Sequence, residues 1–386
     1  MKKNFIKFIF LILIIGSSLS AIAQGDIATL FKSGVTDLNT VLNGYMKPMG
    51  TGFAANLGSN WYNTGAPHKL LGFDLTIGFG AAMAPTADQT FSLLGLKNLK
   101  PIGSETTAPS FAGTGKKGVD LQLLQPATLT VGGQTIANPH GGEKITSFTT
   151  PPGVLNLIPG VSGQLGLGLP FGTQIMVRFV PTVTASGFKM GLWGIGIQHN
   201  FKQWIPVVKD LPFDASIVIG YTKLTVGYDF APADMITPDK LVDASVGYIS
   251  PVGIAFNNQK IKLTSNALTA NVVVSKKLLF FTPYLGFGFT SSKFDLGFKG
   301  NYPVVGDPYV KLVTVGGQQV PDVTDPNNGK LQITNMVDPI DLNYKNMMPN
   351  LTVGFRLKIL WVLAFHAQYT LQKYPIISGG FGINFR

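Results

Sequence analysis

The chain has 386 residues, including 46 glycines, 25 prolines and 27 phenylalanines, and it contains no cysteine. The absence of cysteine excludes disulfide frameworks, thiolate metal sites and a lipidated N-terminal cysteine. Only 13% of the residues are charged, against about 25% in ordinary globular domains. No basic cluster with interleaved aromatic residues occurs, so the composition predicts no nucleic-acid partner.

Residues 1–23 have the anatomy of a secretory signal peptide. A basic region, an apolar run and a small-residue cleavage site follow one another: Lys2, Lys3 and Lys7, then residues 8–15, then Ala21 and Ala23. The apolar run is too short for a hydrocarbon layer that needs about 20 residues. The sequence therefore predicts export, cleavage after Ala23, and a mature chain with 27 basic and 19 acidic residues.

Residues 24–67 are predicted to form an N-terminal helix followed by a plug-like segment. Apolar residues recur at helical spacing over residues 26–47, with Asp26 as a possible N-cap and Pro48 after the predicted end. The helix fits either a packing arm or an interfacial membrane helix. Residues 50–67, GTGFAANLGSNWYNTGAP, are rich in small and amide residues, which suits a chain threaded through a confined space. The candidate plug residues are Asn56, Asn60, Trp61 and Asn63, with a surface linker as the alternative.

Residues 68–386 are predicted to form strands, because apolar residues recur at every second position. The clearest run covers residues 69–83, where Leu75, Ile77 and Phe79 alternate with polar or small residues. Further candidates are residues 119–124, 128–131, 172–184, 187–200, 213–230, 240–248, 260–274, 280–298, 311–315, 330–343 and two or three runs within 347–386. The total is about 14 strands, within a range of roughly 12 to 16.

The hydrophobicity of the mature chain is spread over many short elements. The mean hydropathy is +0.26, yet no apolar stretch after residue 23 approaches the length of a transmembrane helix. Some predicted connections are tight turns, whereas residues 300–326 form a long polar excursion. These features predict an all-β fold, a transmembrane antiparallel β-barrel in the cell outer membrane, with outer-membrane lipid and lipopolysaccharide as partners. A secreted soluble β-protein is the alternative.

No residue pattern predicts an enzyme, a metal site or another cofactor. The four histidines lack metal-ligand spacing, and the GxSxG motif of a serine hydrolase does not occur. The polar side of the predicted strands supplies candidate lumen or ligand residues instead, because side chains alternate along a strand. These are Arg178, Arg356, Lys358 and His366.

The order of features resembles the FadL-like group of Gram-negative outer-membrane barrels, in particular diverged members from the Bacteroidota. A signal peptide, a helix and the segment GTGFAANLGSNWYNTGAP are followed by an apolar first strand, a connector over residues 199–212 and strands up to Phe385. The resemblance is one of layout over most of the mature chain. It implies a barrel of about 14 strands that is plugged by its N-terminal segment and passes hydrophobic small molecules.

Two functions within the outer membrane remain open from the sequence. The first is passive uptake or binding of hydrophobic small molecules through a plugged lumen. The second is a structural barrel, or an assembly or secretion partner, without transport. The sequence names neither a cargo nor a protein partner.

Overall fold

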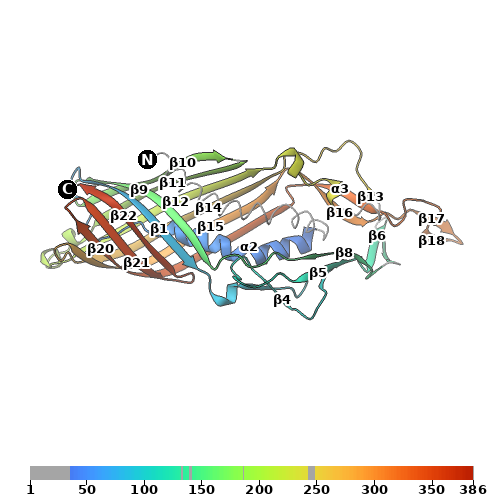
Figure 1. Ribbon diagram of the computed structural model, residues 1–386, viewed down its shortest axis with the longest axis horizontal. Helices are drawn as coiled ribbons and strands as arrows, with labels where there is room; N and C mark the ends of the chain where they lie inside the picture. The colour runs from blue at the N-terminus through green and yellow to red at the C-terminus, as the bar shows by residue number, and fades with distance from the viewer. Residues whose placement is uncertain (1–34, 132–133, 139–140, 186, 242–247, 386) are drawn as a thin grey trace.

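The structure is a computed structural model that describes residues 35–131, 134–138, 141–185, 187–241 and 248–385. A closed antiparallel barrel of ten strands dominates the described residues (Figure 1). Around the ring the order is β1-β22-β21-β20-β15-β14-β12-β11-β10-β9. The barrel strands are β1 Phe73–Met83, β9 Leu157–Leu169, β10 Thr173–Ala185, β11 Phe188–Asn200, β12 Asp214–Asp229, β14 Lys260–Ser275, β15 Phe281–Lys299, β20 Ile340–Ile359, β21 Leu363–Leu371 and β22 Ile376–Phe385.

The antiparallel barrel is confirmed, but the ring has ten strands and not about 14. The difference arises because twelve shorter strands pair in small sheets outside the ring. Their alternation of apolar and polar residues therefore does not mark strands of the barrel. These are β2 Thr90–Ser92, β3 Leu99–Pro101, β4 Thr107–Pro109, β5 Asp120–Leu124, β6 Thr128–Val131, β7 Gln134–Ala137, β8 Lys144–Thr149, β13 Tyr248–Ile249, β16 Asn301–Pro308, β17 Leu312–Val315, β18 Gln318–Pro321 and β19 Leu331–Val337.

The described helices are few. They are α2 Val35–Gly58, α3 Pro238–Leu241 and the 3-10 turns η1 Thr86–Asp88, η2 Lys202–Trp204, η3 Val208–Asp210 and η4 Pro232–Asp234. In the described part of the chain, none of them is long and apolar enough to cross a membrane. The end of α3 takes the place of the predicted strand at residues 240–241, and residues 242–247 lie outside the described residues.

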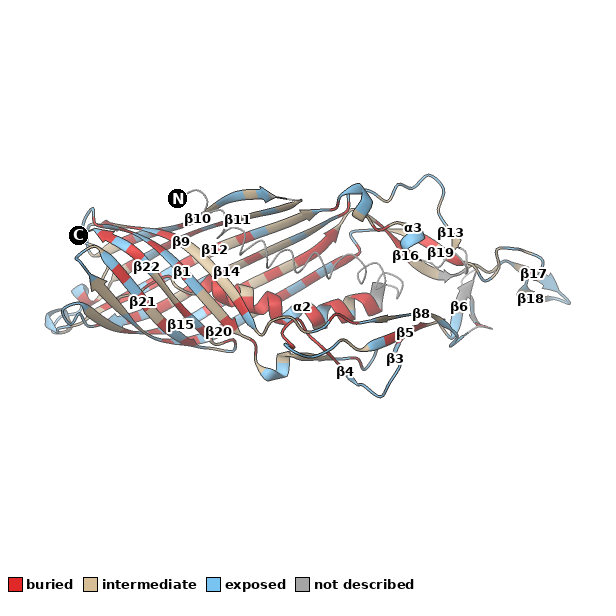
Figure 2. Ribbon diagram, in the orientation of Figure 1, coloured by how far each residue is buried: buried red, intermediate tan, exposed pale blue. Residues whose placement is uncertain are grey.

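The barrel exposes apolar side chains and buries polar ones. On β1, Leu75 and Ile77 are exposed, whereas the alternating Asp74 and Thr76 are buried inside. Figure 2 shows the same alternation around the ring. A soluble barrel would show the reverse pattern, because its apolar face would line the core. The observed arrangement is that of a membrane barrel with a polar interior, and it weighs against the soluble alternative.

The two ends of the barrel differ. At one end, here called the turn end, short connections join β9 to β10, β14 to β15 and β20 to β21. Strand β1 begins and strand β22 ends at this same end. At the other end, residues 84–156, 230–259 and 300–339 form long excursions, here called the head (Figure 1). Strand β22 closes the ring against β1, with Phe381 opposite Ile77.

Helix α2 runs from the head into the barrel (Figure 1). The expected helix covered residues 26–47, of which 26–34 lie outside the described residues, and the observed helix passes through Pro48 to Gly58. Proline removes one backbone hydrogen bond, yet Tyr45 and Met49 on either side are 5% and 1% exposed. Their burial offsets the lost hydrogen bond, so the proline does not end the helix.

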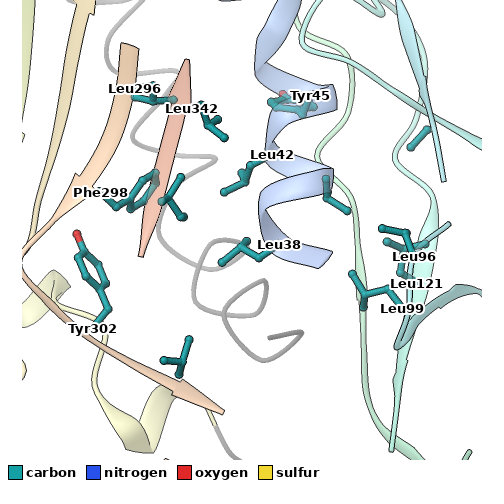
Figure 3. Close-up of a cluster of buried hydrophobic side chains, with 14 of the residues drawn as sticks. Leu38, Leu42, Tyr45, Leu96, Leu99, Leu121, Leu296, Phe298, Tyr302 and Leu342 are labelled. Carbon is teal, nitrogen blue, oxygen red and sulfur yellow. The ribbon is translucent and has the colours of Figure 1, made fainter. Parts of the chain in front are cut away.

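An apolar core in the head holds the first half of α2. Leu38, Leu42 and Tyr45 of the helix pack between two layers of side chains, which come from the head and from the adjoining ends of the barrel strands (Figure 3). One layer carries Leu96, Leu99 and Leu121, and the other carries Leu296, Phe298, Tyr302 and Leu342. The carboxylate of Asp37 accepts hydrogen bonds from the backbone N–H groups of residues 97, 98 and 99 at 2.8–3.0 Å. The head and α2 are therefore one packed unit.

Candidate lumen site

The interior of the barrel is occupied by residues 55–68, here called the lumen segment. It comprises the last turn of α2 and the stretch that leads to β1. Trp61 is fully buried, and glycines on two neighbouring strands make room for its ring. A methyl group at Gly220 would come within 2.3 Å of the ring, and one at Gly196 within 2.6 Å.

Arg178 fixes the turn between α2 and the extended part of the lumen segment. Its Nη1 donates to the carbonyl of Leu57 at 3.1 Å and its Nη2 to the carbonyl of Ser59 at 2.7 Å. Its Nε donates to Gln164 Oε1 on β9 at 3.0 Å. The guanidinium also lies over the Trp61 ring, 3.8 Å from the centroid, where a cation is attracted to the face of the aromatic ring. The side chain is only 1% exposed.

Inward polar side chains hold the extended stretch from Thr64 to His68. Gln198 donates to the Thr64 carbonyl at 2.8 Å, and the Gly65 N–H donates to Ser275 Oγ at 2.9 Å. The His68 N–H donates to Gln174 Oε1 at 2.9 Å. These contacts come from three strands, β11, β14 and β10, which lie on one side of the ring, so the segment is held against that part of the wall. Buried backbone groups need such partners because no strand pairs with them.

A second polar group lies where the lumen segment meets the turn end. His68 Nε2 and Asp74 Oδ1 are 2.7 Å apart. Asn384 on β22 lies beside His68, and Lys358 donates to Asn384 Oδ1 at 3.0 Å. The lumen segment is thus joined to β1, β20 and β22 before the first strand begins.

The candidate lumen residues all lie on inward positions. Arg356 on β20 and His366 on β21 are directly paired across the two strands. His366 is 6% exposed, whereas Arg356 and Lys358 are half-buried. Arg178 stands apart from this group, on β10, and it binds the lumen segment through its hydrogen bonds to the carbonyls of Leu57 and Ser59.

The four candidate plug residues have different surroundings. Asn56 donates to the carbonyl of Ile158 on β9 at 2.7 Å, and Asn60 donates to the carbonyl of Phe79 on β1 at 3.0 Å. Trp61 packs beneath Arg178. Asn63 is half-buried in the same segment.

The space left beside the lumen segment is small and polar. A cavity of about 10 Å³, close to the minimum that holds one water molecule, lies between residues 55–62 and the wall formed by β14, β15, β20 and β21. Asn271, Thr290, Asn350, Thr352 and Gln368 line it. The oxygens Oδ1 of Asn271 and Asn350 are buried and have no hydrogen-bond partner among the described residues. This side of the lumen is therefore polar and nearly filled.

The opposite side of the lumen carries a break in the wall and an apolar cluster beside it. Pairing between β9 and β10 runs from Leu169↔Thr173 to Gln164↔Arg178 and then stops in the described residues. Strand β9 nevertheless stays paired with β1 as far as Leu157, and β10 stays paired with β11 as far as Ala185. Beyond the Gln164↔Arg178 pair, the described residues of β9 and β10 are therefore not paired with each other.

An apolar cluster lies on the inner face beside this break. Leu57, Leu192, Leu224 and Ala267 form its buried part, and Val180, Met190 and Val226 pack against it half-buried. Val180 belongs to the unpaired part of β10. The break and the cluster are therefore adjacent.

Sequence reasoning missed most residues that hold the lumen segment. Gln164, Gln174, Gln198, Ser216 and Ser275 are buried polar residues on inward positions. The sequence signal for these residues was that each alternates along its strand with apolar residues of the outer face, as Gln198 does with Ile197. That signal identifies a lumen-facing residue, but it does not tell which of them contacts a segment 130 residues away.

The fold and this interior define a ten-stranded, membrane-type β-barrel whose lumen holds the chain segment that precedes its first strand. The chain belongs to the family of unknown function DUF6588, which matches residues 1–385. No curated protein matches the sequence.

Three solved structures are similar to this chain at very low identity. Ail, the attachment invasion locus protein of Yersinia pestis, is 7% identical, with a TM-score of 0.25 over 82% of this chain and 99% of that chain. The translocator domain of the autotransporter NalP from Neisseria meningitidis is 6% identical, with a TM-score of 0.27 over 86% and 92%. A Pseudomonas aeruginosa FadL homologue is 9% identical, with a TM-score of 0.18 over 87% and 96%.

Proposed function

We propose that this chain is an outer-membrane β-barrel that binds small hydrophobic compounds and passes them through the break between β9 and β10 into the lumen. The export signal expected at residues 1–23, the exposed apolar face and the short connections at one end all support an outer-membrane location. The turn end then faces the periplasm and the head faces outward.

The break beside the apolar cluster is the observation that carries this proposal. Its first unpaired residue on β9, Gly163, is paired on its other side with Ile77 of β1, and Val161 is paired with Phe79. Ile77 and Phe79 are exposed apolar residues of the outer face. The break thus lies at the height of the lipid-facing band. Unpaired backbone groups facing lipid cost several kcal/mol each, so a barrel without a use for the break would be expected to close it.

The sequence keeps the two strand ends apart. Pro159 lies in the unpaired part of β9 and Pro181 in that of β10, next to a register shift between Val180 and Val183. Proline has no N–H to donate and is confined to strand edges and bulges. Two prolines in the unpaired strand ends on either side of this break therefore favour a permanent break over a complete ladder.

A hydrophobic compound that entered through the break would meet the cluster formed by Val180, Leu192 and Leu224. Burying apolar surface there is favourable by roughly 25 cal/mol per Å². Leu57 of the lumen segment belongs to the same cluster. A ligand that displaces Leu57 would compete with the two hydrogen bonds that Arg178 makes just beside it. We propose that the lumen segment acts as a plug that moves when such a compound binds.

Uptake of a hydrophobic dye into proteoliposomes tests the proposal. The full-length protein is expected to admit dye faster than protein-free vesicles, and deletion of residues 25–67 should raise the rate further. Arg178→Ala, which keeps the plug but removes its hydrogen bonds, should give an intermediate rate. Negligible and identical uptake by all three proteins would refute transport. Native-like heat-modifiable gel mobility of each variant establishes that the barrels are folded.

A structural barrel without transport is the second candidate, and the filled lumen favours it. Hydrogen bonds from β10, β11 and β14 hold residues 57–65, and the remaining cavity takes about one water molecule. In this case the barrel would anchor the head at the cell surface. Proteoliposomes distinguish the two, because a structural barrel should bind no dye and should admit none after the plug is deleted.

A further inference from the structure

The turn end carries large apolar residues in a backbone conformation that they rarely adopt. Nine non-glycine residues among those described have positive φ angles, and three of them are Asn or Asp, which tolerate this region. The other six are all apolar and all lie at the turn end: Leu71 at 60°, Phe171 at 59°, Val207 at 69°, Leu279 at 55°, Leu360 at 50° and Trp361 at 64°.

Turn geometry does not explain these residue types. Glycine or asparagine would adopt the same φ angles with less strain, and each strained residue costs of order 1–3 kcal/mol. The side chains also gain little from packing within the protein, because Leu279 is 88% exposed and Trp361 is 90% exposed. A medium outside the protein must therefore favour an apolar side chain at these tips.

The apolar tips continue the lipid-facing band of the strands. Phe73 and Phe385 stack at the same end, with ring centroids 4.8 Å apart, and both are exposed. Beyond them lie the exposed side chains of Leu71 and, on the next turn, Phe171. Trp204 and Trp361 are exposed in two further connections, and tryptophan is enriched at the level of lipid headgroups.

Exposed charge at this end is mainly positive. Lys69, Lys209, Lys276 and Lys277 are exposed there, against one exposed carboxylate, Asp210, among the described residues of these connections. Basic side chains next to aromatic and aliphatic ones are the pattern of a surface that meets anionic lipid. The same pattern would be unfavourable for a turn that only projects into water.

An open cavity of about 300 Å³ lies within this ring, between residues 66–70 and the β9–β10 turn. Its lining combines apolar side chains of Leu70, Leu169 and Phe171 with Lys69, and Asp214 contributes one carboxyl group. This mixture suits an amphipathic ligand whose anionic head lies near the lysine.

We propose that the turn end binds anionic phospholipid of the leaflet on that side of the membrane, with the apolar tips inserted among the acyl chains and Lys69, Lys276 and Lys277 at the phosphates. The inference rests on the membrane placement proposed above but not on any transported compound. Uptake of dye in vesicles of neutral lipid can therefore succeed or fail independently of it.

Binding of phosphatidylglycerol and phosphatidylcholine to the full-length protein, measured by native mass spectrometry from detergent, tests this proposal. A single surface lysine near an anionic membrane contributes about a fivefold gain in affinity. The native protein should thus prefer phosphatidylglycerol by at least about tenfold, and K276Q/K277Q should lose most of that preference. The matched control is K116Q/K117Q, which removes an equally exposed adjacent pair from the head and should change nothing.

A second variant tests the apolar tips. Leu360→Asn with Trp361→Gly relaxes the two positive φ angles, so the variant should fold at least as well in detergent, yet it should bind both phospholipids more weakly. Equal affinity of the native protein for the two lipids would overturn the proposal. An equal loss in the head control, or displacement of bound lipid by inorganic phosphate, would overturn it too, since either would show that no membrane-specific site exists at this end.

Discussion

The guanidinium of Arg178 lies 3.8 Å from the centroid of the Trp61 ring while it donates to the carbonyls of Leu57 and Ser59. One side chain of β10 thus holds the residues on both sides of the end of α2. Arg178 is also the last residue of β10 that pairs with β9. The anchor of the lumen segment and the start of the break in the wall coincide at this residue.

Arg178→Met should loosen the lumen segment. Methionine keeps much of the apolar volume but leaves the Leu57 and Ser59 carbonyls without their donors, a loss of about 1–3 kcal/mol for each buried group. Because the chain has no native cysteine, Ser59→Cys can be added as a single reporter. Its labelling by a maleimide should be about tenfold faster in the Arg178→Met background. Arg356→Met, which changes an inward arginine on the other side of the lumen, should leave the labelling rate unchanged.

Gly220→Ala should destabilise the barrel by about 1–3 kcal/mol, the typical cost of overpacking. The added methyl group would meet the Trp61 ring at 2.3 Å. Gly227→Ala on the same strand is the matched control, since its methyl group would have no atom nearer than about 4.0 Å. Unfolding in urea measures both. If Trp61→Leu fails to restore the stability of the Gly220→Ala variant, the loss does not come from the ring contact.

The sequence was sufficient to predict the barrel strands in which apolar residues occupy one face and polar or small residues occupy the other. In β1, Leu75 and Ile77 alternate with Asp74 and Thr76, and both faces were assigned correctly. The same reasoning placed Arg178, Arg356 and His366 on inward positions. Local alternation carries this information because side-chain direction has a period of two residues.

The strand count and the end of α2 depend on distant contacts, so local patterns did not give them. Residues 119–124 alternate like a barrel stave, but they pair with β3 and β8 in the head. Pro48 is a normal helix stop, yet the packing of Tyr45 and Met49 overrides it. The break between β9 and β10 had a sequence signal, the prolines at 159 and 181, which becomes readable only once the two strands are known to be neighbours.

Leu38→Ala should destabilise the head by about 2–5 kcal/mol, because the removed side chain is fully buried between two layers. The lost contacts lie where α2 meets the head, so the long excursions should become sensitive to protease while the barrel stays resistant. Leu94→Ala, at a position that is 71% exposed, should change stability by less than about 0.5 kcal/mol. Equal protease sensitivity of the two variants would show that α2 does not hold the head.

The connection between β15 and β20 should weaken in acid. The Gly300 N–H donates to Asp338 Oδ1 at 2.8 Å and lowers the pKa of that carboxyl, with Lys299 at 3.3 Å adding to the effect. A lowered pKa means that the stabilisation is complete above the unfolded value of about 3.9 and is lost as the pH falls through the folded value. Because the side chain is 43% exposed, the effect should stay below about 1 kcal/mol. Hydrogen exchange at Gly300 between pH 6 and 3 should reveal it.

Asp338→Asn provides the control for this pH dependence. Asparagine tolerates the positive φ of 53° at this position but cannot titrate. Exchange at Gly300 in this variant should therefore lose the acid-dependent component after correction for intrinsic rates. A component that persists unchanged would assign the acid sensitivity to another group.

The rate of dye uptake by the double variant S162C/V180C, before and after reduction, tests the central claim most directly. Continuing the β9–β10 register beyond Gln164↔Arg178 places these two residues opposite each other across the break. A disulfide or a short bis-maleimide there should close it. The control is T352C/T370C, a pair that already faces across β20 and β21 with hydroxyls 2.9 Å apart. We predict that cross-linking suppresses uptake only in S162C/V180C and that reduction of its disulfide restores it; uptake that is equally fast with the seam cross-linked and open would contradict the proposed route.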